Sequence, residues 1–159
     1  MTLTLIRSEY QDQVAVFEWS AAHEYRWPCL ALLFGSLMGT KLPPKYLNKA
    51  IKAGMKKGKP DINLPVTMGG YCGLWIELKK KGGEKPREDQ EKTLKMLAVA
   101  GNAVYVCKGS TAAIRVIEDY LKGKISRKKP WEEFDPTQQL IPDRIGYGGE
   151  QMIGSITNT

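Results

Sequence analysis

The sequence predicts a mixed α/β domain in which one sheet is flanked by helices. Segments with apolar residues at helical spacing alternate along the chain with short apolar or strictly alternating segments that suit strands. Glycine and proline separate these segments. The length of 159 residues is typical of one domain and is sufficient to bury a core. The predicted order is helix, strand, lysine-rich helix, strand, strand, helix, strand, helix.

The first predicted helix begins after Ser8 and ends near His23. Ser8 and Gln11 have the spacing of a capping box, which satisfies backbone donors at a helix start. The apolar residues that recur at helical period are Tyr10, Val14, Phe17 and Ala21. Pro28 breaks this pattern, and the apolar run 29–34 predicts a buried strand.

A hairpin is predicted in the middle of the chain, with strands at 61–66 and 73–80 and a turn at 67–70. The elements predicted after it are a helix from Pro86 or Arg87 to Ala100, a strand at 103–107 and a helix from Ser110 to Leu121. Ser110 is expected to cap the last helix. The residues expected to face inward from the helix before it are Leu94, Leu97 and Ala98.

Residue counts exclude several classes of protein. The three cysteines and the single histidine are widely spaced and include no Cys-x-x-Cys, so they lack the short ligand spacings of a zinc site. The longest apolar run is too short for a membrane span, which needs about 20 residues, and the first residues lack a signal-peptide pattern. We therefore expect a soluble cytoplasmic protein whose chemistry depends on carboxylates and lysines.

The net charge of +7 comes from one stretch, residues 41–60, which we call the lysine segment. It holds seven lysines and no acidic residue. Part of it predicts a helix with one lysine face, which begins after Pro43 and Pro44 and ends at Gly54. Its buried side is expected to consist of Leu47, Ala50 and Ile51. Like charges at this spacing repel one another, so the face suits a polyanion such as DNA. The alternative is a solvated face that aids solubility. The candidate DNA-binding residues are Lys45, Lys49, Lys52, Lys56, Lys57 and Lys59.

The predicted hairpin brings together two carboxylates and a lysine. Paired residues in an antiparallel hairpin have a constant index sum, which is 138 for Asp61 and Glu77 and centres the turn on Gly69. Lys79 shares the face of Glu77. Such a group suits Mg²⁺, which prefers oxygen ligands and can activate water toward a phosphodiester. The alternative is a plain cross-strand ion pair.

Pro60-Asp61 followed by Glu77-Leu78-Lys79 is the motif pair of the PD-(D/E)xK nuclease superfamily. Residues 54–65 and 73–79, followed by Gly82-Gly83 and a helix with Gln90, resemble the virus-type replication-repair nuclease (VRR-NUC) family. The resemblance implies a restriction-endonuclease-like αβββαβ core with one mixed sheet and an inserted basic helix. The resemblance covers roughly residues 8–121. The composition changes from Lys124 on, with three prolines and, after residue 145, four glycines, so we place the nuclease domain at 1–123 and a C-terminal arm at 124–159. Trp131 and Phe134 of this arm are expected to pack on the core or on a second subunit.

The resemblance also assigns roles to individual residues. The implied ligands of Mg²⁺, or of Mn²⁺ as a substitute, are Glu9, Asp61, Glu77 and the carbonyl of Leu78. The implied catalytic residues are Asp61, Glu77, Lys79 and Gln90. Alternatively, Glu9 is a first-turn acid favoured by the helix dipole, and Gln90 is an ordinary helix residue. The stretch Ser36-Leu37-Met38-Gly39 departs from a Pro-Asn-Gly-like turn that family members often carry.

Taken together, we expect a metal-dependent DNA endonuclease that acts on branched DNA. Small stand-alone members of the family are similar to phage or plasmid Holliday-junction resolvases that work as homodimers. A monomeric flap nuclease has the same chemistry, and a non-catalytic basic DNA-binding module is the alternative from another class. Binding alone needs basic residues but not converging acids, so Asp61 and Glu77 favour the enzyme.

Overall fold

The computed structural model describes residues 8–36, 42–80, 82–83, 85–125 and 140–141. Its helices are α1 (Glu9–His23), α2 (Pro44–Lys52), α3 (Glu88–Val99) and α4 (Ser110–Leu121), with the 3₁₀ helix η1 at Pro28–Leu32. Its strands are β1 (Phe34–Gly35), β2 (Ile62–Leu64), β3 (Leu74–Lys79), β4 (Ala103–Lys108) and β5 (Leu140–Ile141). The chain therefore follows the predicted αβββαβ order, with α2 inserted between β1 and β2.

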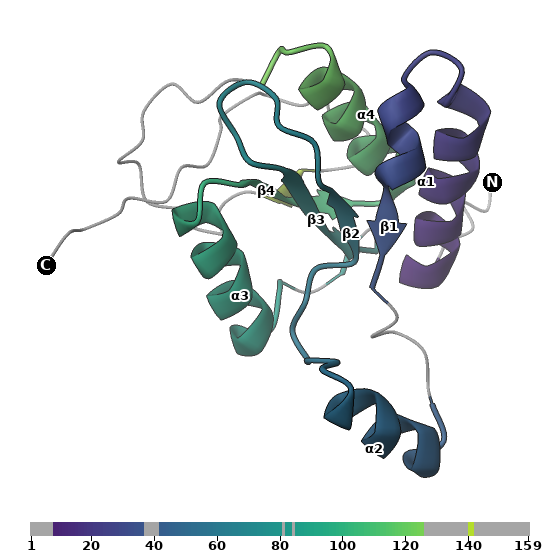
Figure 1. Ribbon diagram of the computed structural model, residues 1–159, viewed down its shortest axis with the longest axis vertical. Helices are drawn as coiled ribbons and strands as arrows, with labels where there is room; N and C mark the ends of the chain where they lie inside the picture. Colours follow the sequence, from purple (N-terminus) through teal and green to yellow (C-terminus); the bar gives the residue numbers. More distant parts are fainter. Residues whose placement is uncertain (1–7, 37–41, 81, 84, 126–139, 142–159) are drawn as a thin grey trace, which may run out of the picture.

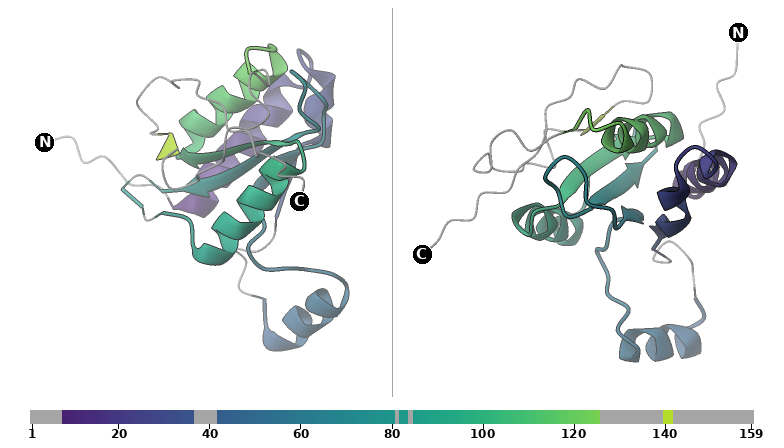
Figure 2. Two further views of the ribbon diagram at one scale, coloured as in Figure 1. Left: turned by 90° about the vertical axis from the view of Figure 1, so that its left-hand side faces the viewer. Right: turned by 45° about the horizontal axis from the view of Figure 1, so that its top comes forward.

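The five described strands form one mixed sheet in the order β1-β2-β3-β4-β5. The pairs β1–β2 and β2–β3 are antiparallel, whereas β3–β4 and β4–β5 are parallel. Helices α1 and α4 lie on one face of the sheet and α3 lies on the other (Figures 1 and 2). This arrangement confirms the predicted fold class of one mixed sheet flanked by helices.

The hairpin register agrees with the sequence arithmetic. Ile62 pairs with Ile76 and Leu64 pairs with Leu74, so the ladder has the predicted index sum of 138. Gly69 and Gly70 both have positive φ, 60° and 86°, at the tip of the hairpin. Only glycine adopts two such angles in a row at little cost, which is why the turn forms here.

Two local predictions were wrong, and the apolar stripe of α1 is only partly buried. The run 29–34 is not a strand, because the chain forms η1 there and becomes extended only at β1; an apolar run alone does not distinguish the two. Ser110 does not cap α4: the N-cap is Gly109, and the Ser110 N–H donates to Asp12 Oδ1 at 3.1 Å. On α1 the buried residues are Asp12, Val16 and Ser20, and of the apolar residues that recur at helical period Phe17 packs against the core while Tyr10 is exposed.

The inserted helix α2 projects from the end of the sheet where β2 begins and β3 ends (Figure 1). None of its residues is buried, and Ile51 is 46% exposed, so the expected burial of Leu47, Ala50 and Ile51 was wrong. The physical reason is its position, because the helix extends away from the sheet and its helices rather than packing on them. Its lysines are exposed, as a DNA-binding face requires.

Two packed clusters hold the sheet. The larger lies under α1 and α4, and the smaller, under α3, joins Leu94 and Ala98 to Val104 and Val106 of β4. Leu94 and Ala98 thus face inward as predicted, and Leu97 packs against them. Most residues of the expected C-terminal arm, including Trp131 and Phe134, lie outside the described residues. Within the arm, β5 pairs with β4, and the division at residues 123 and 124 stays a prediction.

Candidate active site

The candidate site lies at the end of the sheet from which α2 projects. β3 ends there with Glu77 and Lys79, and the chain enters β2 there through Asp61. Helices α1 and α3 both begin near this end (Figure 1). The fold thus brings residues from the first helix, the hairpin and the third helix to one edge of the sheet.

Asp61 is fixed by hydrogen bonds on both its side chain and its backbone. Its carboxylate Oδ2 accepts the Leu78 N–H at 2.7 Å. Its backbone carbonyl accepts the Ser36 N–H at 2.8 Å and the Gln13 side-chain amide at 3.2 Å. Burial raises the pKa of Asp61 above its ordinary value of 3.8, although the Leu78 N–H and the Lys79 ammonium oppose this shift.

Glu77 is the centre of a buried polar cluster. Its Oε1 accepts a hydrogen bond from Lys79 Nζ at 2.8 Å and another from the Gln90 side-chain amide. Lys79 Nζ also donates to Gln90 Oε1 at 3.2 Å. All three residues are buried, with Glu77 only 1% exposed. Gln90 is therefore not the solvent-facing residue that the alternative interpretation described.

Burial raises the pKa of Glu77 to about 8, with a further contribution from the Asp61 carboxylate. Lys79 opposes this shift through its charge and its hydrogen bond. The Glu9 carboxylate raises the pKa of both Asp61 and Glu77, so the start of α1 lies within electrostatic reach of the pair. Such clustering of perturbed carboxylates is typical of functional sites.

The carboxylates at this edge can supply oxygen ligands for a metal ion. Glu77 Oε2 is buried and has no hydrogen-bond partner among the described residues. A buried carboxylate oxygen without a partner is costly, and a divalent cation would satisfy it. In the part of the chain that the structure describes, no three His, Cys, Asp or Glu side chains are close enough to hold a metal ion. Mg²⁺ needs only one or two protein carboxylates besides water and phosphate oxygens, so Asp61 and Glu77 fit this chemistry. The roles of Glu9 and of the Leu78 carbonyl stay predictions.

Sequence reasoning missed Gln13, which links α1 to the strand end that carries Asp61. Gln13 is one helical turn after Glu9, so both lie on the same face of α1. A side chain at Gly35 would place its Cβ only 2.5 Å from Gln13 Nε2. Gly35 therefore leaves the space that lets Gln13 reach the Asp61 carbonyl. The spacing from Glu9 was the signal in the sequence that could have identified Gln13.

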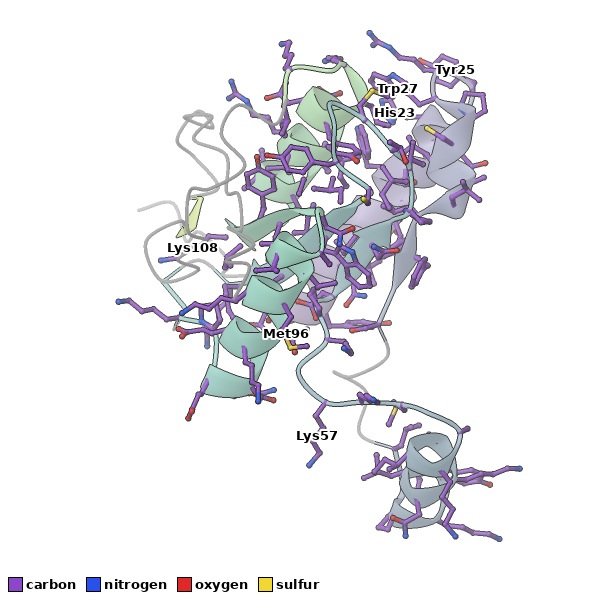
Figure 3. All side chains as sticks on the ribbon, turned by 60° about the vertical axis from the view of Figure 1, so that its left-hand side comes forward. His23, Tyr25, Trp27, Lys57, Met96 and Lys108 are labelled. Carbon is purple, nitrogen blue, oxygen red and sulfur yellow. The ribbon has the colours of Figure 1, made fainter. Side chains whose placement is uncertain are left out.

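The lysine segment returns from α2 to the candidate site. Gly58 has a φ of +74°, and a Cβ there would lie 2.9 Å from the Asp89 carbonyl oxygen at the start of α3. This close approach holds Lys57 and Lys59 next to the first turn of the helix that carries Gln90. Figure 3 shows the Lys57 side chain pointing away from the sheet. The candidate DNA-binding lysines are all exposed, and their interaction with DNA stays a prediction.

Comparisons with known proteins agree with this geometry. A solved structure described as "VRR_NUC domain protein" is similar to this chain with a TM-score of 0.62 and 30% sequence identity. The similarity covers 84% of this chain and 98% of that chain. No family model and no curated protein matches the sequence. Among the described residues, no helix is long and apolar enough to cross a membrane.

Proposed function

Because this chain belongs to the VRR_NUC domain family, we propose that it is a metal-dependent endonuclease that cleaves phosphodiester bonds in branched DNA. Within that class we propose a Holliday-junction resolvase that acts as a homodimer. The observation that carries the proposal is the buried cluster of Glu77, Lys79 and Gln90 beside Asp61. A buried lysine held between a carboxylate and an amide is costly to form, which argues for a function beyond stability.

Asp61 and Glu77 would hold the metal ion, with Glu9 and the Leu78 carbonyl as further ligands. A bound Mg²⁺ or Mn²⁺ would polarise the phosphodiester and lower the pKa of a water molecule. Glu77 Oε2 supports this role, because no side chain or backbone group in the described part of the chain already satisfies it. The Leu78 N–H orients Asp61 toward the same edge of the sheet.

Lys79 supplies a fixed positive charge at the site. Its ammonium lies 2.8 Å from Glu77 Oε1 and 3.2 Å from Gln90 Oε1, so its position is set before DNA binds. A preorganised cation stabilises negative charge that develops on a phosphate without reorganising during the reaction. Gln90 orients both Lys79 and Glu77, and its own Oε1 is held by the Arg87 N–H at 2.9 Å.

The lysine segment would guide DNA to this edge. Its exposed lysines can neutralise backbone phosphates, and the close packing of Gly58 on α3 brings its end to the site. Two sites related by a two-fold axis would cut the two matching strands of a four-way junction, which is why we propose a homodimer. We place this activity in recombination or repair of phage or plasmid DNA inside a bacterial host.

The test is cleavage of a labelled four-way junction, a flap and a plain duplex, each with Mg²⁺, Mn²⁺ or EDTA. Asp61→Ala and Lys79→Ala should each lower the cleavage rate by about 100-fold or more, the usual effect of removing an electrostatic interaction from an active site. Lys92→Ala, which removes an exposed lysine from α3, is the matched control and should cut like wild type.

The outcomes separate the alternatives. Paired, metal-dependent cuts in the junction, together with a dimer in light scattering, would support the resolvase. Cleavage of the flap by a monomer would support the proposed active site but contradict the four-way junction as the substrate. No cleavage, with salt-sensitive DNA binding that survives both site substitutions, would contradict the enzyme and leave a DNA-binding module.

A further inference from the structure

An open groove runs along α1 and reaches the candidate active site. Its volume is about 860 Å³, within the range of about 300–1,000 Å³ of ligand pockets. Glu9 and Asp61 line the groove near the site, and Lys80 lines it as well. The other lining residues are Ser8, Tyr10, Gln13, Val14, Phe17, Glu18, Ala21 and Ser36. A substrate bound at Asp61 would therefore lie next to this groove.

The α1 side of the groove carries four apolar residues beside the polar Glu9, Gln13 and Glu18. These apolar residues are Tyr10, Val14, Phe17 and Ala21, which recur at helical period; Tyr10 is 75% exposed, and Phe17 is partly buried against the core. The buried residues of α1 are Asp12, Val16 and Ser20. A helix that buries Asp12 and Ser20 but exposes an aromatic ring, Tyr10, beside an active site points to a ligand for the exposed ring.

The charges around the groove favour an uncharged ring as this ligand. Glu9, Glu18 and Asp61 would repel a phosphate group, and Lys80 is the only cation among the described lining residues. A nucleotide base is uncharged and has a π-face that stacks on aromatic side chains. A second protein copy seated here would bury the three carboxylates and would need partners for them.

We infer that the α1 groove is a subsite for one unpaired DNA base next to the cleaved phosphodiester. Tyr10 and Phe17 would provide the aromatic contacts, and Lys80 would bind a phosphate of the same nucleotide. Bases inside a duplex are stacked and paired, so the subsite is filled only where the nucleotide at the cleavage position is unpaired or its base pair opens. This inference rests on the proposed function. It gives a reason to prefer branched DNA over plain duplex, because a base pair at a branch point loses stacking on one side and opens at a lower cost.

The test measures binding without cleavage, by fluorescence anisotropy in Ca²⁺ or in EDTA. The probes are a short duplex with one unpaired 2-aminopurine and the same duplex with that base paired. Tyr10→Ala should weaken binding of the unpaired probe by about tenfold, the usual effect of removing one stacking ring, and should leave the paired probe unchanged. Tyr10→Phe keeps the ring and should bind like wild type. Tyr46→Ala, which removes an aromatic ring from α2 that is 60% exposed, is the control for a general weakening of DNA binding.

Stacking should also quench the 2-aminopurine fluorescence in wild type but not in Tyr10→Ala. Equal weakening of both probes, or no weakening of either, would overturn the subsite. A Tyr10→Ala protein that changes from dimer to monomer in light scattering would also overturn it, because the groove would then be a subunit contact. Tyr10-dependent binding without cleavage of any DNA would contradict the nuclease but keep the subsite. Cleavage of DNA together with equal binding of the two probes would support the nuclease and contradict the subsite.

Discussion

The protein without metal should become less stable as the pH rises from about 5 to about 8, because of Glu77. The pKa of this carboxyl is raised from 4.5 to about 8 by burial and by Asp61. At a pH between these two values, Glu77 keeps its proton in the folded state and has lost it in the unfolded state. The stabilisation by this proton is complete at a pH below the pKa of Glu77 in the unfolded state. It is lost as the pH rises through the pKa of Glu77 in the folded state.

The size of the effect has a physical limit. One proton changes the free energy of unfolding by at most about 1.4 kcal/mol per pH unit. Because Glu77 is 1% exposed, solvent screening reduces this value little. Asp61 adds to the fall of the free energy of unfolding in the lower part of this pH range, since its pKa is also raised. The assay is urea unfolding followed by tryptophan fluorescence, in EDTA, at several pH values.

Glu77→Gln cannot titrate, so its unfolding free energy should lose most of this slope between pH 6 and pH 8, the upper part of the window set by a pKa of about 8. Glu88→Gln makes the same chemical change at an exposed position of α3 and should keep the wild-type slope. If Glu77→Gln and wild type have the same slope, the proton does not reside on Glu77 and our view of the buried cluster is incorrect.

Three further changes test the interactions around the site. Asp12→Ala removes the acceptor 3.1 Å from the Ser110 N–H and should lower the free energy of unfolding by about 1–2 kcal/mol in urea titrations. Gly35→Ala puts a Cβ 2.5 Å from Gln13 Nε2 and should slow cleavage by about tenfold or more through displacement of the site; an unchanged rate would refute the positioning role of Gln13. Replacing the three lysines of α2 with glutamine should reduce the salt slope of duplex binding by about 0.9 for each phosphate that is no longer neutralised, without changing stability.

The parts of the site that were predictable depend on local rules. The turn at Gly69 and the two-residue alternation of β3 determine which residues oppose each other, and the observed ladder has the predicted register. The same rules placed Asp61, Glu77 and Lys79 at one edge. The resemblance to VRR-NUC proteins added Gln90, whose side chain bonds to both Glu77 and Lys79.

The parts that could not be predicted depend on interactions between distant segments. The bond between Gln13 and the Asp61 carbonyl joins residues 48 positions apart, and that between Asp12 and Ser110 joins residues 98 positions apart. No periodicity encodes such pairs. The stripe with Tyr10 satisfies helical spacing, but packing of α1 on α4 buries the other face. The apolar side of α2 also satisfies the helical pattern, yet Ile51 is exposed, because a pattern does not say what the helix packs against.

The most direct test of the central claim is calorimetric titration of Mn²⁺ into the DNA-free protein near neutral pH. If Asp61 and Glu77 form the metal site, wild type should bind Mn²⁺ and release a proton, because the pKa of Glu77 is about 8 and binding needs the carboxylate. Asp61→Asn and Glu77→Gln should both lose this binding, and Glu88→Gln should retain it. Equal Mn²⁺ binding by all four proteins, or binding without proton release, would contradict the account.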